Sequence, residues 1–167
     1  SHRVSRRFPQ FDPKTLPASL AAAGIRYVFL GAGLGARPRD PACYVRGRAD
    51  FERIRASVAF AEDLARLRRG AEDYRVCLMC AERDPADCHR TWLVAQALHE
   101  TGSVVTHILA DGTVEPHAAL LRRVAGVDSG TRSLFDDEEE LLEATARREA
   151  ARVAYSPDGP QGEEGGE

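Results

Sequence analysis

The sequence predicts an α/β domain with a mainly parallel sheet, because short apolar runs of strand length alternate with amphipathic stretches of helical length. Runs with strand character, rich in β-branched, aromatic and other apolar residues, occur at 25–30, 74–80 and 103–109. The chain of 167 residues suits one domain, which we expect over residues 1–155.

Helices are expected where apolar residues recur every three or four positions or where capping residues frame a stretch: 15–23, 51–69, 84–100, 116–124 and 136–153. Gly24 and Gly70 would end the first two of them. Strands that alternate with helices predict a three-layer sandwich of the Rossmann-like or flavodoxin-like kind, with right-handed crossovers. The Gly-, Pro- and Glu-rich tail at 156–167 is expected to be disordered.

The composition is that of an ordinary globular protein, with 43% hydrophobic and 29% charged residues. No apolar run approaches the roughly 20 residues that span a bilayer, and no signal peptide is recognisable, so we expect no membrane partner and a cytoplasmic location. The four cysteines, Cys43, Cys77, Cys80 and Cys88, are then expected to be reduced thiols.

Charge is unevenly distributed along the chain. Residues 1–55 hold eleven Lys/Arg and four Asp/Glu, whereas residues 133–167 hold three and eleven. The basic part suits phosphate, nucleotide or nucleic acid, and one hypothesis is a nucleic-acid-binding module that uses Arg3, Arg6 and Arg7 with Phe8 and Phe11. The alternative is that arginine is simply the common surface cation here, and that the acidic end is a solvated helix face.

The segment Cys80–Arg90 concentrates reactive side chains where the strand 74–80 gives way to a helix. Ligands of open α/β sheets bind at such carboxyl ends of strands. His89 and Arg90, near a helix start, could hold an anion. Cys88 could be a thiolate nucleophile, and Glu82 a general base or an orienting partner of His89.

A purely structural role fits the same residues. Asp84 is a good N-cap before Pro85, Asp87 could complete a capping box, Glu82 and Arg83 could form a surface pair, and Cys77 could be a small buried strand residue.

Two specific motifs were tested against this segment. The C-x5-R phosphatase or rhodanese loop does not fit, because Ala86 and Val94 stand where the arginine would be. Cys80, Cys88 and His89 could supply three metal ligands, but no fourth is obvious and no metal is assigned. Cys77 and Cys80 form C-x-x-C on an expected strand, where their side chains would point to opposite faces.

The pattern LMCAERDP followed by Cys88-His89-Arg90 resembles the signature of the family called domain of unknown function 488. Weaker similarities extend it over roughly residues 1–125: Arg7–Phe11, Gly24–Gly31, His107–Leu109 and Glu115–His117. The resemblance implies an α/β sandwich and a site in Cys80–Arg90, but no reaction. It also implies that the usual N-terminal strand-helix-strand unit is missing from this chain.

The leading hypothesis is therefore a small enzyme or ligand-binding domain for a phosphate-bearing or nucleotide-like anion. Thiol or metal-dependent chemistry and nucleic-acid binding remain alternatives, and no cofactor is identified. We assign Glu82, Cys88 and His89 as catalytic. The ligand-binding residues are expected to be Cys80, Arg83, Arg90, Arg7 and Gln10.

Overall fold

The structure is a computed structural model that describes residues 9–80, 82–127 and 138–156. The chain divides into two compact units, residues 1–31 and 32–167. Arg7 and the tail 157–167 lie outside the described residues, as do Arg3, Arg6 and Phe8 of the nucleic-acid hypothesis.

The described part of the first unit contains the short turn η1 (Pro9–Phe11) and the helix α1 (Leu16–Ala22). The helix ends as predicted, because Gly24 has a left-handed φ of 71° and its N–H donates to the carbonyl of Ala21. The run 25–30 that follows is not a strand, and Ile25, Val28 and Phe29 are exposed.

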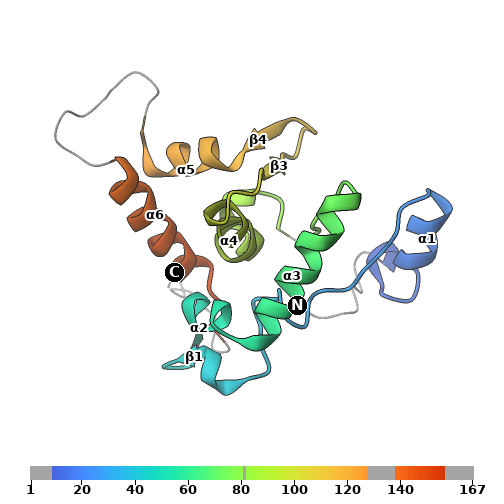
Figure 1. The fold of residues 1–167 in the computed structure, drawn as a ribbon, viewed down its shortest axis with the longest axis horizontal. Coiled ribbons are helices and arrows are strands. Elements are labelled where there is room, and N and C mark those ends of the chain that lie inside the picture. Colours follow the sequence, from blue (N-terminus) through green and yellow to red (C-terminus); the bar gives the residue numbers. More distant parts are fainter. Residues whose placement is uncertain (1–8, 81, 128–137, 157–167) are drawn as a thin grey trace, which may run out of the picture. The chain divides into compact units, whose positions relative to one another are not determined.

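The second unit is mostly helical (Figure 1). Its elements, in chain order, are η2 (Pro41–Cys43), β1 (Tyr44–Val45), β2 (Arg48–Ala49), α2 (Phe51–Arg55), α3 (Val58–Asp73), η3 (Pro85–Asp87), η4 (Arg90–Ala95), α4 (Gln96–Glu100), β3 (Thr106–Ile108), β4 (Val114–Pro116), α5 (His117–Ala125) and α6 (Glu138–Val153). Within the described residues, no helix is both long enough and apolar enough to cross a bilayer.

The predicted Rossmann-like or flavodoxin-like sandwich is wrong. The strands of the described residues form two antiparallel hairpins, β1–β2 and β3–β4, and none pairs in parallel. Strand-forming residues make a strand only when a neighbour completes the ladder. The run 74–80 has no such neighbour among the described residues, and its Tyr74, Val76 and Met79 are exposed rather than buried.

The run 103–109 does pair, but locally. Asp111 accepts hydrogen bonds from the backbone N–H and hydroxyl of Thr113, and Gly112 adopts a φ of 86°. This turn brings β4 back beside β3 after a five-residue connection. A short loop costs little conformational entropy to close, so the local hairpin forms without a distant parallel partner.

The helix predicted over 51–69 is two helices. Ser57 is extended and its hydroxyl accepts from the N–H of Phe60, so it caps the start of α3. Because of this interruption, α3 buries a different face from the one predicted for a single continuous helix. Val58 is exposed, whereas Phe60 and Leu67 are buried.

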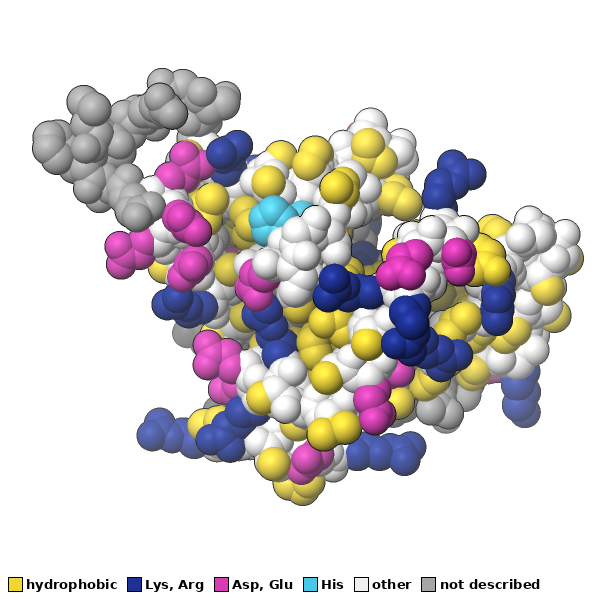
Figure 2. All heavy atoms as spheres, viewed as in Figure 1, with side chains coloured by type: hydrophobic (Ala, Val, Ile, Leu, Met, Phe, Trp, Pro, Cys, Tyr) yellow, Lys and Arg dark blue, Asp and Glu magenta, His cyan; other side chains and the backbone are white. Residues whose placement is uncertain are grey.

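The core of the second unit surrounds η4, a π-helical turn that continues into α4. Trp92, Leu93 and Val94 are at most 2% exposed. η4 contacts α6, and α6 also packs against α5. Figure 1 shows α5 and α6 next to each other. The acidic side chains at the start of α6 are visible as a group in Figure 2, at the end of the helix where its dipole favours negative charge.

A buried histidine pair lies in this unit. Nε2 of His107 is 2.9 Å from Nδ1 of His117, whose Nε2 is 2.9 Å from the side-chain oxygen of Gln96. Gln96 donates in turn to Glu100, which fixes the orientation of its amide. A neutral His117 ring therefore donates to Gln96 through Nε2 and accepts from His107 at Nδ1.

Burial, together with the neighbouring His107 and His99, lowers the pKa of His117 from 6.5 to about 3. Between about pH 3 and pH 6.5 the unfolded chain therefore binds a proton at His117 that the folded chain does not bind. The contribution of His117 to the free energy of unfolding is fully present above about pH 6.5 and is lost as the pH falls toward 3.

We expect His117→Gln to reduce this dependence. From pH 7 to pH 4.5 the wild type should lose roughly 2–3 kcal/mol of unfolding free energy more than the variant does. Urea titrations of both proteins at each pH measure the difference. Parallel losses in the two proteins would contradict a neutral, buried His117.

Candidate functional site

Most of the predicted site residues lie where residues 74–80 end and η3 starts. Asp84 caps η3 as predicted, because its carboxylate accepts from the N–H of Ala86 at 2.8 Å. The helix expected over 84–100 is interrupted, however. Cys88 is extended, with φ −106° and ψ 130°, and the helical conformation resumes at His89, with φ −56° and ψ −31°.

This interruption has a consequence for side-chain direction. Two adjacent residues in a strand point to opposite faces. Here the change from extended to helical backbone between Cys88 and His89 lets both side chains face one point. The π-helical geometry of the turn that follows is also uncommon, and such turns are frequent at functional sites.

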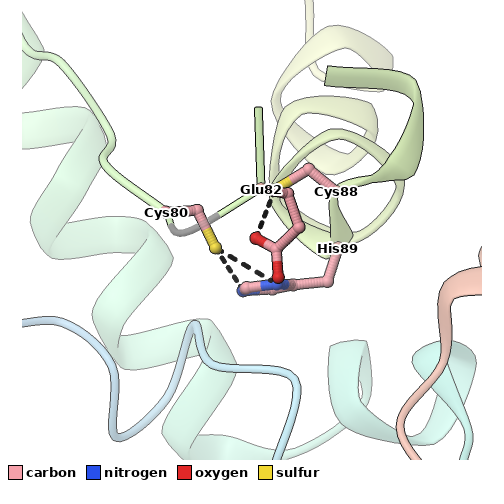
Figure 3. Close-up of side chains that lie close together, drawn as sticks. All are labelled: Cys80, Glu82, Cys88 and His89. Carbon is pink, nitrogen blue, oxygen red and sulfur yellow. Dashed lines mark hydrogen bonds between the residues drawn. The ribbon is translucent and has the colours of Figure 1, made fainter. Parts of the chain in front are cut away.

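Four of the predicted site residues meet at that point. One ligand atom from each of Cys80, Glu82, Cys88 and His89 lies within 4.8 Å of every other (Figure 3). Sγ of Cys80 is 3.5 Å from Nδ1 and 4.0 Å from Nε2 of His89. Sγ of Cys88 is 3.4 Å from Oε2 of Glu82. We call these four residues the CECH cluster.

The cluster is closed on one side and open on the other. Cys88 is fully buried, whereas Cys80 and His89 are half-buried and Glu82 is exposed. The Cys88 thiol thus lies deepest, and the Glu82 carboxylate forms the side of the cluster that faces water.

The four groups influence one another's protonation. Hydrogen bonding with Cys88, and then burial, raises the pKa of the Cys80 thiol. The same bond lowers the pKa of Cys88 against the effect of burial, and the Arg90 guanidinium assists. Partial burial would raise the pKa of Glu82, but hydrogen bonds from the two thiols lower it. The mutual hydrogen bonds therefore lower the pKa of Glu82 and Cys88 and raise that of Cys80.

Arg90 is directed at the protein backbone. Its Nη1 donates to the carbonyl of Leu78 at 2.7 Å, so it ties residues 74–80 to η4. Leu78 lies two residues before Cys80, so this hydrogen bond gives Arg90 a role in positioning Cys80.

The remaining predicted residues lie elsewhere. Arg83 is exposed on the turn before η3, and Gln10 is exposed in η1 of the first unit. Cys77, expected to be buried, is exposed. Asp87, expected as a capping-box acid, forms an ion pair with Arg152 at 2.9 Å.

Larger hollows lie away from the CECH cluster. Two clefts of about 510 and 530 Å³ are bordered by other parts of the second unit, and Gln96 and Glu100 line both of them. None of the four cluster residues lines either cleft. The short distances inside the cluster leave room for an ion between its ligand atoms rather than for an organic molecule.

The fold and the cluster together define a mostly helical domain in which two thiols, an imidazole and a carboxylate converge. Residues 2–97 match the model of the family described as domain of unknown function DUF488, and the chain belongs to that family. The predicted family membership is confirmed, and the match ends within α4, so that α5 and α6 lie outside it. No curated protein and no solved structure gives a significant match.

We expect Arg90→Ala to lower the free energy of unfolding by about 1–2 kcal/mol, because the carbonyl of Leu78 loses a charged donor. Arg90→Lys should recover part of the loss, since an ammonium can still donate one hydrogen bond. Guanidinium unfolding curves of the three proteins measure the effect. An unchanged midpoint for Arg90→Ala would show that this contact does not hold residues 74–80.

Proposed function

We propose that this protein binds a transition-metal ion, foremost Zn²⁺, in the CECH cluster. Cys80, Cys88 and His89 are the three soft or borderline ligands, and Glu82 is the fourth. The observation that carries the proposal is the convergence of one ligand atom from each residue within 4.8 Å.

The distances match the edges of a zinc tetrahedron. Bonds of roughly 2.3 Å to sulfur and about 2.0–2.2 Å to nitrogen or oxygen give edges of about 3.8 Å between two sulfurs and about 3.5 Å between sulfur and a nitrogen or oxygen. The Cys80–His89 contact of 3.5 Å and the Cys88–Glu82 contact of 3.4 Å already have that length. All four ligand atoms lie within 4.8 Å of one another, so the remaining separations exceed these edges by at most about 1.3 Å.

The donor set selects the class of metal. Thiolates favour Zn²⁺ and other soft or borderline ions, whereas Mg²⁺ and Ca²⁺ require oxygen ligands. The lowered pKa of Cys88 favours the thiolate that coordinates a metal, whereas Cys80, whose pKa is raised, would release its proton when the ion binds.

Glu82 gives the proposed centre an exchangeable position. It is the exposed member of the cluster, so a water molecule or a small anion can replace its carboxylate on the metal without entering the core. Catalytic zinc sites keep such a position open, whereas structural sites are closed by four protein ligands. The proposed anionic ligand would then bind to the metal and not to Arg90, whose guanidinium contacts the backbone.

Metal-free nucleophilic catalysis by Cys88 is less well supported. A reactive cysteine needs access to its substrate as well as a lowered pKa, and Cys88 is fully buried.

We expect protein purified without chelators to contain one equivalent of zinc, measured by elemental analysis. Cys80→Ser and Cys88→Ser should each weaken zinc binding by more than about 100-fold, since even the loss of an outer-shell partner costs 10–100-fold. Cys77→Ser is the matched control, because this thiol is exposed and lies three residues before Cys80. Equal affinity in Cys77→Ser and Cys88→Ser would exclude the proposed centre.

Glu82→Gln should affect the metal differently from the cysteine variants. The ion should remain bound, about tenfold more weakly, because both thiolates and the imidazole, the ligands that favour Zn²⁺ most, are retained. In the Co²⁺-substituted protein, azide should then perturb the visible spectrum at lower concentrations than in the wild type. If Glu82→Gln loses the metal as completely as Cys88→Ser, the carboxylate is a fixed ligand and the site is closed.

A further inference from the structure

We propose that Arg152, on α6, is a positioning residue for the CECH cluster, because it fixes the loop that delivers Cys88 and His89. This inference rests on the proposed metal centre. It assigns part of the site to a helix that lies outside the region matched by the family model.

The guanidinium of Arg152 reaches the loop at two adjacent residues. Its Nη2 donates to the backbone carbonyl of Ala86 at 2.9 Å and forms an ion pair with Oδ1 of Asp87 at 2.9 Å. One side chain thus restrains both the backbone and a side chain of η3, immediately before Cys88.

The Ala86 carbonyl also accepts a second hydrogen bond, from a residue of the core. The indole Nε1 of Trp92 donates to it at 2.7 Å, and Trp92 is 2% exposed. Two donors from two elements, η4 and α6, therefore meet at a single acceptor. Since η3 is itself closed by a hydrogen bond from the N–H of Cys88 to the carbonyl of Pro85, a shift at Ala86 moves Cys88 with it.

Arg152 is itself held in place. Its Nε donates to Oε2 of Glu149 at 2.5 Å, one turn earlier on α6, and the Glu149 side chain is only 11% exposed. The neighbouring Ala146 and Thr145 are buried, and α6 contacts η4. We call Arg152 and its contacts with Ala86 and Asp87 the clamp. The clamp is therefore anchored on a packed helix, which is what an orienting residue requires.

The location explains why the contact matters for ligand geometry. Cys80 and Glu82 precede η3 in the chain, whereas Cys88 and His89 follow it directly. Without Arg152, the η3 carbonyl keeps only the indole donor, and the position of Sγ of Cys88 relative to the other ligand atoms becomes less fixed. Losing a partner that is hydrogen-bonded to a metal ligand lowers metal affinity by about 10–100-fold. Arg152 acts one residue further away, so we expect an effect at the low end of that range.

The test compares Arg152→Ala with Arg147→Ala in the full chain. Arg147 lies on the same helix and forms an ion pair with Glu143, but that pair does not involve the loop. Co²⁺ is titrated into each metal-free protein, and both the affinity and the thiolate-to-cobalt absorption are recorded. We expect about tenfold weaker binding and an altered spectrum for Arg152→Ala, wild-type behaviour for Arg147→Ala, and partial recovery in Arg152→Lys.

A second readout does not depend on the metal. The rate at which Cys88 is alkylated in the metal-free proteins, resolved from Cys77 by peptide mass spectrometry, should rise in Arg152→Ala and stay unchanged in Arg147→Ala. If the wild type binds neither Zn²⁺ nor Co²⁺, the proposed function fails, and the alkylation rates still decide whether the clamp exists.

The clamp is overturned if Arg152→Ala matches the wild type in cobalt affinity, spectrum and Cys88 alkylation rate. Circular dichroism at the titration temperature confirms that each variant is folded. If Arg152→Ala is not folded, Arg152→Met decides the question, because its side chain keeps the apolar stem but cannot donate to Ala86 or pair with Asp87. Wild-type cobalt affinity, spectrum and alkylation rate in Arg152→Met would overturn the proposal.

Discussion

The buried turn η4 is the element on which the site depends. Its residues Thr91–Ala95 are almost entirely withdrawn from solvent, and they pack against α6 and η3. Because η4 begins at the residue after His89, the core of the domain fixes one end of the CECH cluster directly. The indole of Trp92 extends that control backwards to the Ala86 carbonyl, so a hydrophobic residue of the core also orients the loop that carries Cys88.

The cluster therefore joins two parts that differ in how firmly they are held. Cys88 and His89 belong to the packed part. Cys80 follows a segment of exposed apolar residues that has no ladder partner among the described residues, and the Arg90–Leu78 hydrogen bond links it to η4. A metal ion shared by Cys80 and Cys88 would cross-link the two parts, and its binding energy would contribute to the stability of the folded chain.

The predicted sheet does not form for the same reason that residues 74–80 are held less firmly: an apolar run needs a neighbouring strand to pair with. The runs 25–30, 74–80 and 103–109 have strand composition, but composition reports a preference and not a partner. Thr106–Ile108 forms a strand because the Asp111-Gly112 turn returns β4 beside it, and that turn is readable in the sequence. Parallel pairing over long sequence separations has no comparable local signal, so the pattern could not decide it.

The sequence by itself indicated the segment that carries the candidate site and how its loop begins: the stretch Cys80–Arg90, the Asp84 cap and the family membership are all local patterns of residue type and spacing. Only the tertiary structure decided that Cys80, Glu82 and the neighbours Cys88 and His89 converge while Arg83 and Gln10 do not, and that Arg152 reaches the loop from 66 residues away. The physical reason is that local patterns record short-range preferences of the backbone. The direction of a side chain depends instead on backbone angles and contacts that packing settles.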